Sequence, residues 1–338
     1  MKKHIYFFGW PSDYGGADTK AAHLFALLAG YVEITVVPNH VDSLKETKWT
    51  TYLDELGIKY AAADSLPKKL NGVALTLCNV NFFGQGICKF ATERGLPIVW
   101  SSEMSWHLDQ EVAVIKGGQI ARLLYVSDAQ KSILNYESFC DVPTRMTGNY
   151  IDPSFFPFHD RVVSERVTIG RLSRADPFKY PDRFPETYES LEVPYANFRV
   201  MAWDSRLAKL YETHAFDERW ELLEKGSEST VKFLQSLDLF VYDLGPKCTE
   251  SWGRSTVEAM LTGAIPIVPK GHHFHELILD GETGFICQTP KDFREHAQQL
   301  AGDQVLRKKM SRACRDHAES KLCNAEEHRK IWLEALDV

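Results

Sequence analysis

Short apolar runs alternate with helix-like stretches along the first half of the chain. Apolar runs bounded by turn signals are typical of buried strands, and their alternation with helices predicts a parallel sheet covered by helices. The strands expected here lie at Ile5–Phe8, Glu33–Val37, Val73–Leu77, Pro97–Trp100 and Leu123–Val126, and helical spacing occupies Ala17–Ala29.

The pattern changes near Ile151–Pro157, where a segment rich in proline and phenylalanine leads into the polar stretch Asp160–Arg166. A second alternating set then begins. Its strands are expected at Val167–Leu172, Phe198–Ala202, Leu239–Tyr242, Ile265–Val268 and Gly284–Cys287, and an amphipathic helix at Ala325–Leu336. Because 338 residues are too many for one ordinary domain, the pattern predicts two α/β domains.

Composition narrows the class of protein. The chain is 44% apolar and 25% charged, and its formal charge of −7 counts against a broad basic face for nucleic acid or anionic lipid. No apolar run approaches the roughly 20 residues of a membrane span. The run Met1–Trp10 is too short for a signal peptide and is interpreted as a first strand, so we expect a cytoplasmic protein. Seven scattered cysteines without a Cys-x-x-Cys pair predict free thiols.

Two carboxylates eight positions apart, Glu250 and Glu258, mark the most informative stretch. They bracket a turn at Gly253 that leads into a helix. A helix N-terminus offers free N–H groups and the positive end of its dipole, which suits a phosphate. Carboxylates before and within such a helix can accept hydrogen bonds from sugar and ribose hydroxyls. The stretch therefore predicts a pocket for a nucleotide diphosphate sugar.

The segment Glu250–Gly284 resembles the Glu-x7-Glu region of retaining glycosyltransferases with the GT-B fold, above all family 4 (group 1). Glu250-Ser251-Trp252-Gly253 matches the family's Glu-x-Phe-Gly, with Trp in place of Phe. The pattern continues in register through Val257–Met260, Gly263, Pro266, Glu276 and Gly281–Gly284.

The resemblance implies an α/β protein of the GT-B fold, with two Rossmann-like, doubly wound domains facing across a cleft. Residues 1–155 would be the acceptor-binding domain and residues 165–324 the donor-binding domain. The C-terminal helix, residues 325–338, would cross back to complete the first domain; the alternative is a plain terminal helix of the second.

The resemblance also implies the residues that meet the donor diphosphate. The Gly15-Gly16 loop would approach it closely, and Arg171, in Gly170-Arg171-Leu172, would neutralise it. A second cation is expected a few residues later. Lys179 lies two positions later than in the family and Tyr180 replaces a glycine, so Lys179 and Arg174 remain alternatives.

One histidine of the family pattern has no direct counterpart. Counted from Pro97, Glu103 falls at the position where the family often has a histidine near the reacting sugar, and His107 follows four residues later. Either side chain can hold a sugar hydroxyl or the acceptor, and both remain candidates. The expected catalytic residues are Glu250, Glu103, His107, Arg171 and Lys179, and the expected donor-binding residues are Gly15, Gly16, Arg171, Arg174, Lys179, Glu250, Ser251, Trp252, Gly253, Arg254, Ser255 and Glu258.

We expect no metal and no cofactor. The histidine-rich run His272–Glu276 contains good ligand types, but its spacing is not a standard zinc pattern. The chain also contains no Asp-x-Asp, the motif that holds a divalent ion beneath the diphosphate in the other large glycosyltransferase fold. Cationic side chains and helix N-termini would then balance the diphosphate.

The expected activity is retaining transfer of a hexose from a nucleotide sugar, UDP- or GDP-linked with UDP-glucose as an example, to a glycan, lipid-linked or small-molecule hydroxyl. The alternatives are a phage-type transferase acting on modified bases of DNA, a non-catalytic nucleotide-sugar binding module, and a sugar-nucleotide epimerase. Aromatic residues near loop ends of the first domain can stack on an acceptor or pack in the core: Trp10, Tyr14, Phe82, Phe83 and Trp106.

Overall fold

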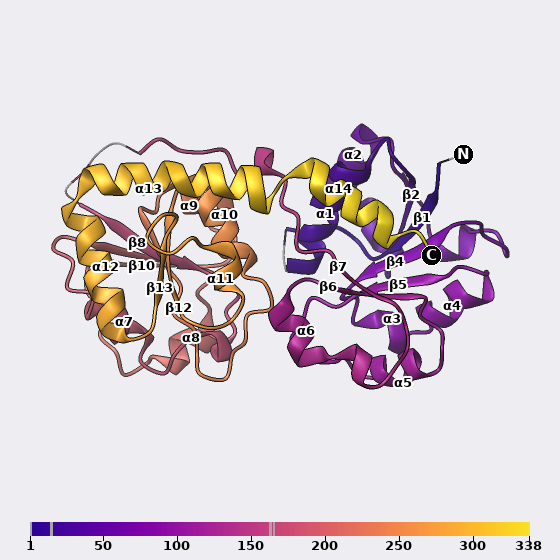
Figure 1. Ribbon diagram of the computed structural model, residues 1–338, viewed down its shortest axis with the longest axis horizontal. Coiled ribbons are helices and arrows are strands. Elements are labelled where there is room, and N and C mark those ends of the chain that lie inside the picture. Colours follow the sequence, from indigo (N-terminus) through magenta and orange to yellow (C-terminus); the bar gives the residue numbers. More distant parts are fainter. Residues whose placement is uncertain (1, 14–15, 162–163, 165) are drawn as a thin grey trace. The chain divides into compact units, whose positions relative to one another are not determined.

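The chain divides into two compact units, each with its own parallel sheet (Figure 1). The structure is a computed structural model and describes residues 2–13, 16–161, 164 and 166–338. Unit 1 comprises Met1–Asp152 and Asn324–Val338, and unit 2 comprises Pro153–Cys323.

The sheet of unit 1 has the strand order β3-β2-β1-β4-β5-β6-β7, and every neighbouring pair is parallel. Its strands are β1 (His4–Phe8), β2 (Glu33–Val37), β3 (Lys59–Tyr60), β4 (Val73–Leu77), β5 (Ile98–Ser101), β6 (Arg122–Tyr125) and β7 (Thr144–Met146). The order reverses between β1 and β4. In doubly wound sheets ligands bind beyond the carboxyl ends of the strands at such a reversal.

Helices cover both faces of this sheet. They are α1 (Gly16–Leu28), α2 (Thr47–Glu55), α3 (Asn81–Gly84), α4 (Ile87–Glu93), α5 (Glu111–Lys116), α6 (Asp128–Leu134) and α14 (Ala325–Ala335), with single turns η1 (Val41–Lys45), η2 (Ala63–Ser65) and η3 (Tyr136–Ser138). Successive side chains of a strand point to opposite faces. Accordingly, Ile5 and Phe7 of β1 pack in one buried cluster with α1 and α14, while Tyr6 and Phe8 pack in the other with α3 and α4.

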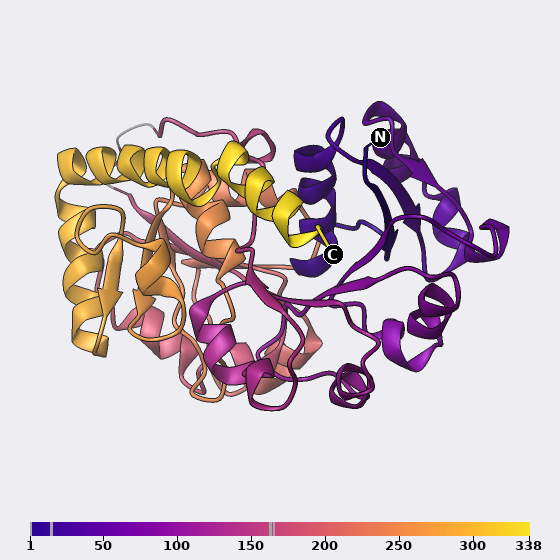
Figure 2. The same cartoon turned by 45° about the vertical axis from the view of Figure 1, so that its right-hand side comes forward.

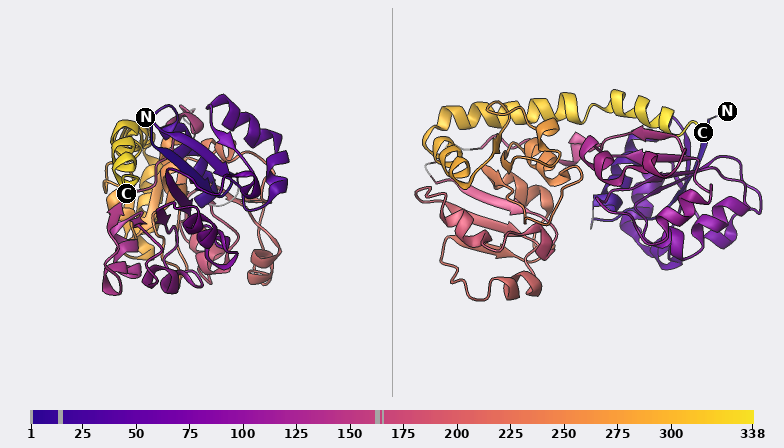
Figure 3. Two further views of the ribbon diagram at one scale, coloured as in Figure 1. Left: turned by 90° about the vertical axis from the view of Figure 1, so that its right-hand side faces the viewer. Right: turned by 60° about the horizontal axis from the view of Figure 1, so that its bottom comes forward.

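The sheet of unit 2 has the order β10-β9-β8-β11-β12-β13 and is also parallel throughout. Its strands are β8 (Thr168–Leu172), β9 (Asn197–Met201), β10 (Trp220–Leu223), β11 (Leu239–Val241), β12 (Ile265–Pro269) and β13 (Phe285–Cys287). Neighbouring strands are rotated relative to one another, as can be followed in the right-hand view of Figure 3, which is the usual twist of a sheet. The order reverses between β8 and β11, so these two carboxyl ends lie side by side.

The helices of unit 2 are α7 (Phe184–Glu189), α8 (Ser205–Leu210), α9 (Thr230–Gln235), α10 (Arg254–Thr262), α11 (Phe274–Leu277), α12 (Pro290–Gly302) and α13 (Gln304–His317), with the short turns η4 (Pro153–Phe155), η5 (Pro177–Lys179) and η6 (Ala318–Leu322). Helix α12 begins with a capping box in which Thr289 and Asp292 satisfy each other's backbone N–H groups. Helix α10 opens directly after Gly253.

The last helix belongs to unit 1, although it follows unit 2 in the sequence. Helix α14 lies beside α1 in both Figure 1 and Figure 2, and its Trp332 is fully buried in the cluster that contains β1 and α1. Lys3 also reaches this helix end, because its ammonium donates to the carbonyl of Leu336 at 2.9 Å and to Asp337 at 2.8 Å. The C-terminal segment therefore closes one face of the unit 1 sheet.

The α/β fold class predicted from the apolar runs is confirmed, and the predicted strands lie within a residue or so of the observed ones. Three edge strands were not predicted: β3, β7 and β10. Each has at most half-buried side chains, as in the exposed and partly buried Thr144–Met146, so none carries the continuous apolar run of a central strand.

Trp332→Ala should destabilise unit 1 by about 3–5 kcal/mol, because it removes a large, fully buried ring from the core beneath α14. Chemical denaturation followed by circular dichroism measures the loss. Lys330→Ala, an exposed position on the same helix, is the control and should change the free energy of unfolding by less than about 0.5 kcal/mol. Equal effects of the two substitutions would contradict a structural role for α14.

Candidate functional site in unit 2

Three polar side chains meet where the strand order of unit 2 reverses. Lys179, from the turn after β8, places its ammonium 2.8 Å from Oε2 of Glu250. The hydroxyl of Tyr242, which follows β11 directly, donates to the same oxygen at 2.9 Å and lies 3.4 Å from the Lys179 ammonium. Glu250 itself lies in the loop between β11 and α10. Two neighbouring strands thus deliver a lysine, a tyrosine and a carboxylate to one point.

Burial makes this cluster electrostatically strong. The side chains of Lys179 and Glu250 are only 18% and 13% exposed, and Tyr242 is fully buried. Burial alone would raise the pKa of the Glu250 carboxyl, but the Lys179 ammonium and the Tyr242 hydroxyl outweigh it and leave that pKa lowered. Burial likewise opposes the charge on Lys179, yet Glu250 raises the pKa of the ammonium overall. Both partners are therefore charged at neutral pH.

Arg171 lies beneath this cluster rather than on its surface. It is 0% exposed, its guanidinium donates to the carbonyls of Asp243 and Lys179, and its Nε lies 3.4 Å from the Ser173 hydroxyl. The guanidinium also stacks on the ring of Tyr180, 3.9 Å from its centre. An enclosed guanidinium has no surface for a diphosphate. Its position therefore differs from the one expected, and its contacts hold the main chain around Lys179.

Arg174, the alternative cation, lies on the surface. Among the described residues its side chain has no hydrogen-bond or ion-pair partner. A free, exposed guanidinium near Lys179 in the sequence is available to an anion. The structure thus separates the three cations of this segment into one enclosed, one paired with Glu250 and one unpaired.

Gly253 sets the geometry at the start of α10. Its φ of 89° is left-handed, and a Cβ there would lie 2.9 Å from the ring of Phe274. Only glycine fits this position without strain. Trp252 before it is buried and faces the His273 ring, whereas Ser251 and Ser255 remain partly exposed beside the helix N-terminus. The expected glycine turn before α10 is therefore present, with Trp252 packed inward, and phosphate binding there stays a prediction.

Glu258 is paired within its own helix. Its carboxylate lies 2.9 Å from Nε of Arg254, one turn earlier, and both side chains are about 10% exposed or less. Burial raises the pKa of the Glu258 carboxyl, and Arg254 only partly offsets that rise. A ribose hydroxyl would have to share this carboxylate with Arg254.

The histidine-rich run makes local contacts. His273 lies 3.0 Å from Glu276, and His275 lies 3.7 Å from the same carboxylate. His272 points elsewhere, because its Nδ1 accepts the backbone N–H of Glu250 at 3.2 Å. Within the described part of the chain, no group of three or more histidine, cysteine, aspartate or glutamate side chains is arranged to hold a metal ion.

In unit 1, Glu103 lies just beyond the carboxyl end of β5 and is paired with a buried lysine. Its Oε1 is 2.8 Å from the ammonium of Lys20 on α1 and accepts the hydroxyl of Ser101 at 2.9 Å. Lys20 is 1% exposed and also donates to the carbonyl of Gly148. Glu103 is therefore held in place at the carboxyl edge of the sheet by Lys20 and Ser101.

His107 has a different environment. It packs against the rings of Tyr136 and Phe139, and its Nδ1 lies 3.8 Å from the fully buried Glu111. Glu111 in turn accepts from the Trp100 indole at 3.0 Å. His107 thus packs against the protein interior. Of the two candidates, Glu103 is the one that lies at the carboxyl end of β5.

Other predicted residues of unit 1 lie in several environments. Gly15 and Tyr14 lie outside the described residues, and Gly16 is the first residue of α1. Phe82 and Phe83 are buried, so of the two alternatives they pack in the core. Trp106 is 54% exposed and so remains available to a ligand.

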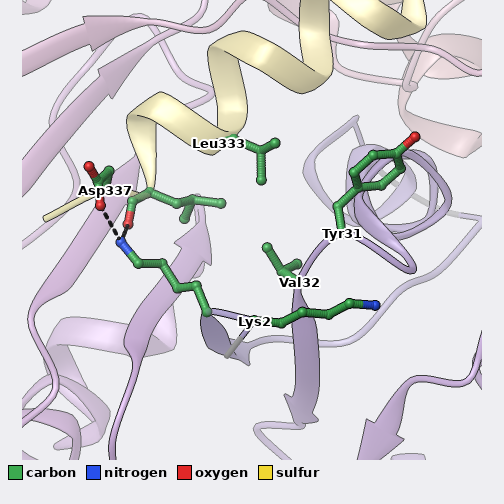
Figure 4. A pocket seen from close by; sticks show the side chains of 7 residues that line it. Lys2, Tyr31, Val32, Leu333 and Asp337 are labelled. Atoms are coloured by element: carbon green, nitrogen blue, oxygen red, sulfur yellow. Dashed lines mark hydrogen bonds and ion pairs between the residues drawn. The ribbon is translucent and has the colours of Figure 1, made fainter.

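A hollow of about 680 Å³ lies at the opposite edge of the unit 1 sheet (Figure 4). It is lined by Lys2, Lys3, Tyr31, Val32, Leu333, Leu336 and Asp337. The first four of these precede β1 and β2, so the hollow is at the amino ends of the strands. It is therefore separate from the polar residues at the carboxyl ends.

Two residues of the unit 2 site were not predicted as members of it, Tyr242 and His272. From the sequence, Tyr242 was expected only as the last residue of a strand, and His272 only as part of a histidine-rich run that does not predict a metal site. Their roles depend on contacts with Glu250, which the sequence does not show.

Part of the chain matches a known protein family. Residues 161–317 match the family model described as glycosyl transferases group 1. The chain also resembles solved structures over nearly its whole length. Anabaena Alr3699/HepE in complex with UDP and glucose has a TM-score of 0.76 at 13% identity, with 99% of each chain covered. These findings support a glycosyltransferase of the GT-B fold.

Two further solved structures share the fold of this chain at similarly low identity. S. aureus TarM has a TM-score of 0.78 at 11% identity, with 99% of each chain covered. Sucrose-phosphate synthase from Thermosynechococcus elongatus has a TM-score of 0.69 at 13% identity, with 98% of each chain covered. No curated protein sequence matches the chain. No helix among the described residues is long and apolar enough to cross a membrane.

Lys179→Met should destabilise unit 2 by about 3–5 kcal/mol at pH 8, because it leaves the buried Glu250 charged without its counter-ion. In the wild type the lowered pKa of Glu250 stabilises the fold above about pH 4.3, and this contribution is lost as the pH falls further. In the variant the sign reverses: a proton neutralises the unpaired carboxyl, so the deficit should shrink as the pH falls.

Urea denaturation at several pH values measures this effect. The double variant Lys179→Met/Glu250→Gln should recover most of the loss. Lys291→Met, which breaks an exposed lysine–glutamate pair in the same unit, is the control and should cost less than about 1 kcal/mol. A deficit that does not change with pH would contradict the buried ion pair.

Proposed function

We propose that the protein is a retaining glycosyltransferase that transfers a hexose from a nucleotide sugar to a hydroxyl acceptor. The observation that carries the proposal is the cluster of Lys179, Tyr242 and Glu250 at the strand reversal of a domain that matches the group 1 family. The structures of Alr3699/HepE were determined with UDP and UDP-glucose, which supports a UDP-sugar as the first donor to test.

In this proposal unit 2 binds the donor. Lys179 and Arg174 neutralise the diphosphate together with the N–H groups at the start of α10. Glu250 accepts hydrogen bonds from hydroxyls of the transferred sugar, and Glu258 accepts from the ribose. Lys179 exchanges part of its contact with Glu250 for the diphosphate. Since these cationic groups balance the donor's charge, we propose that no metal ion or cofactor is required.

The acceptor would bind to unit 1 near Glu103. The bond between the anomeric carbon and the diphosphate oxygen breaks, and its electron pair leaves with the diphosphate. The acceptor oxygen then bonds to the same face of the anomeric carbon, and its proton passes to the departing diphosphate. Configuration is retained without a protein nucleophile. The protein's contribution is positioning and preorganised charge.

Arg171 would act through Lys179 rather than on the donor. Its guanidinium fixes the carbonyls of Lys179 and Asp243, one on each side of the cluster. We therefore assign it a positioning role, and Arg174 the contact with the diphosphate.

Glu250→Ala should lower turnover by about 10²–10³-fold, the usual effect of removing one preorganised polar group from an active site. Donor hydrolysis and thermal stabilisation are measured with UDP-, GDP-, ADP- and dTDP-sugars in the presence of EDTA. Glu295→Ala, an exposed glutamate on α12, is the matched control and should retain wild-type turnover. If no nucleotide sugar stabilises the wild type or is hydrolysed, the proposed function is wrong.

Arg174→Ala should raise the donor KM about tenfold, the loss expected for one charge-assisted hydrogen bond, while the free energy of unfolding changes by less than about 0.5 kcal/mol. Arg171→Ala should instead destabilise the fold by about 3 kcal/mol, because two buried carbonyls lose their donor. Steady-state kinetics and denaturation of both variants separate the roles. An unchanged donor KM in Arg174→Ala would contradict its assignment.

A further inference from the structure

His272 has a backbone conformation that a side chain rarely adopts. Its φ is +56°, in the left-handed region. For residues other than glycine this region costs on the order of 1 kcal/mol, although histidine tolerates it better than most. Glycine would form the same turn without that cost, so the contacts of the imidazole are of interest.

The imidazole is directed at the Glu250 loop. Its Nδ1 accepts the backbone N–H of Glu250 at 3.2 Å. A nitrogen that accepts carries no proton, so the ring is neutral and its proton is on Nε2. Nε2 has no hydrogen-bond partner among the described residues. It is not one of the polar atoms that are fully buried without a partner. His272 therefore offers one free N–H donor beside Glu250.

The surrounding charges favour this neutral ring. The ionisable group that faces His272 is Glu250, whose carboxylate is held by Lys179 and Tyr242. The nearby titratable residues in the sequence are His273 and, on α11, Glu276. Burial lowers the pKa of His272, and the nearby Glu250 carboxylate only partly opposes it. In the free enzyme the His272 imidazole is therefore expected to become protonated only at a pH below about 6.5, the ordinary pKa of histidine.

We propose that His272 is a further residue of the donor site, which positions Glu250 through Nδ1 and donates its Nε2–H to an oxygen of the nucleotide sugar. This inference rests on the proposed function. A protonated Nδ1 could no longer accept the Glu250 N–H, because both nitrogens would then carry a hydrogen and repel each other. The Glu250 loop would lose its support, and the imidazolium would turn toward the carboxylate that should bind the sugar.

The consequence is an acidic limb in kcat/KM that belongs to His272. Wild-type kcat/KM should fall as the pH decreases below about 6.5, because kcat/KM reports groups of the free enzyme. His272→Gly, which keeps the turn and removes the imidazole, should lower kcat/KM about tenfold at pH 8, the loss of about one hydrogen bond, and should lack that limb. Its thermal stability should stay near that of the wild type, because relief of the left-handed backbone offsets the loss of one hydrogen bond.

Two further variants sharpen the test. His272→Asn tolerates the left-handed backbone and can accept through its amide oxygen, so it should retain more activity than His272→Gly but show no acidic limb. His275→Ala removes an exposed histidine of the adjoining helix α11 and should behave as the wild type in rate and pH profile. A limb that persists in His272→Gly would overturn the proposal.

An activity-independent measurement separates this inference from the proposed function. The ¹⁵N shifts of the wild-type imidazole, assigned by the signal lost in His272→Asn, should show a neutral ring protonated on Nε2 at pH 7. A proton on Nδ1 would overturn the inference even in an active enzyme. If the ring has the expected tautomer but no nucleotide sugar binds, the contact stands and the proposed function, with the donor role of Nε2, fails.

Discussion

One carboxylate oxygen, Oε2 of Glu250, is the acceptor on which the unit 2 site depends. It receives the Lys179 ammonium from the segment after β8 and the Tyr242 hydroxyl from the end of β11. The loop before α10 is thereby tied to two neighbouring strands at the point where the strand order reverses. Because the pair is largely withdrawn from water, separating it is costly, and this cost fixes the positions of both charges.

The same principle recurs at the other carboxylates predicted to take part. Glu258 is paired with Arg254, and in unit 1 Glu103 is paired with the buried Lys20. A buried charge requires a partner, so each carboxylate is compensated from within its own unit before any ligand is present. Any ligand that displaces one of these contacts would have to supply a hydrogen bond or charge in its place. Arg171 follows the same principle as a buried cation. Its guanidinium donates to main-chain carbonyls and stacks on an aromatic ring.

How far the fold could be predicted depended on burial. Central strands such as Val73–Leu77 are buried on both faces and show as continuous apolar runs, so their positions were clear. The edge strand β10 is paired on one side only and its side chains are partly exposed, so it has no such signal. Its existence depends on the hydrogen bonds that β9 offers, which come from a different part of the sequence.

The sequence by itself determined the α/β class, the central strands, the glycine turn at Gly253 and the presence of Glu250 and Lys179 in one candidate site, because these follow from local periodicity and motif spacing. The tertiary structure alone decided which charges face each other. It enclosed Arg171, joined Tyr242 and Lys179 at one oxygen, and turned His272 toward the Glu250 backbone. Such contacts join segments far apart in the chain, and a side chain's charge state and orientation depend on those neighbours rather than on its own position in the sequence.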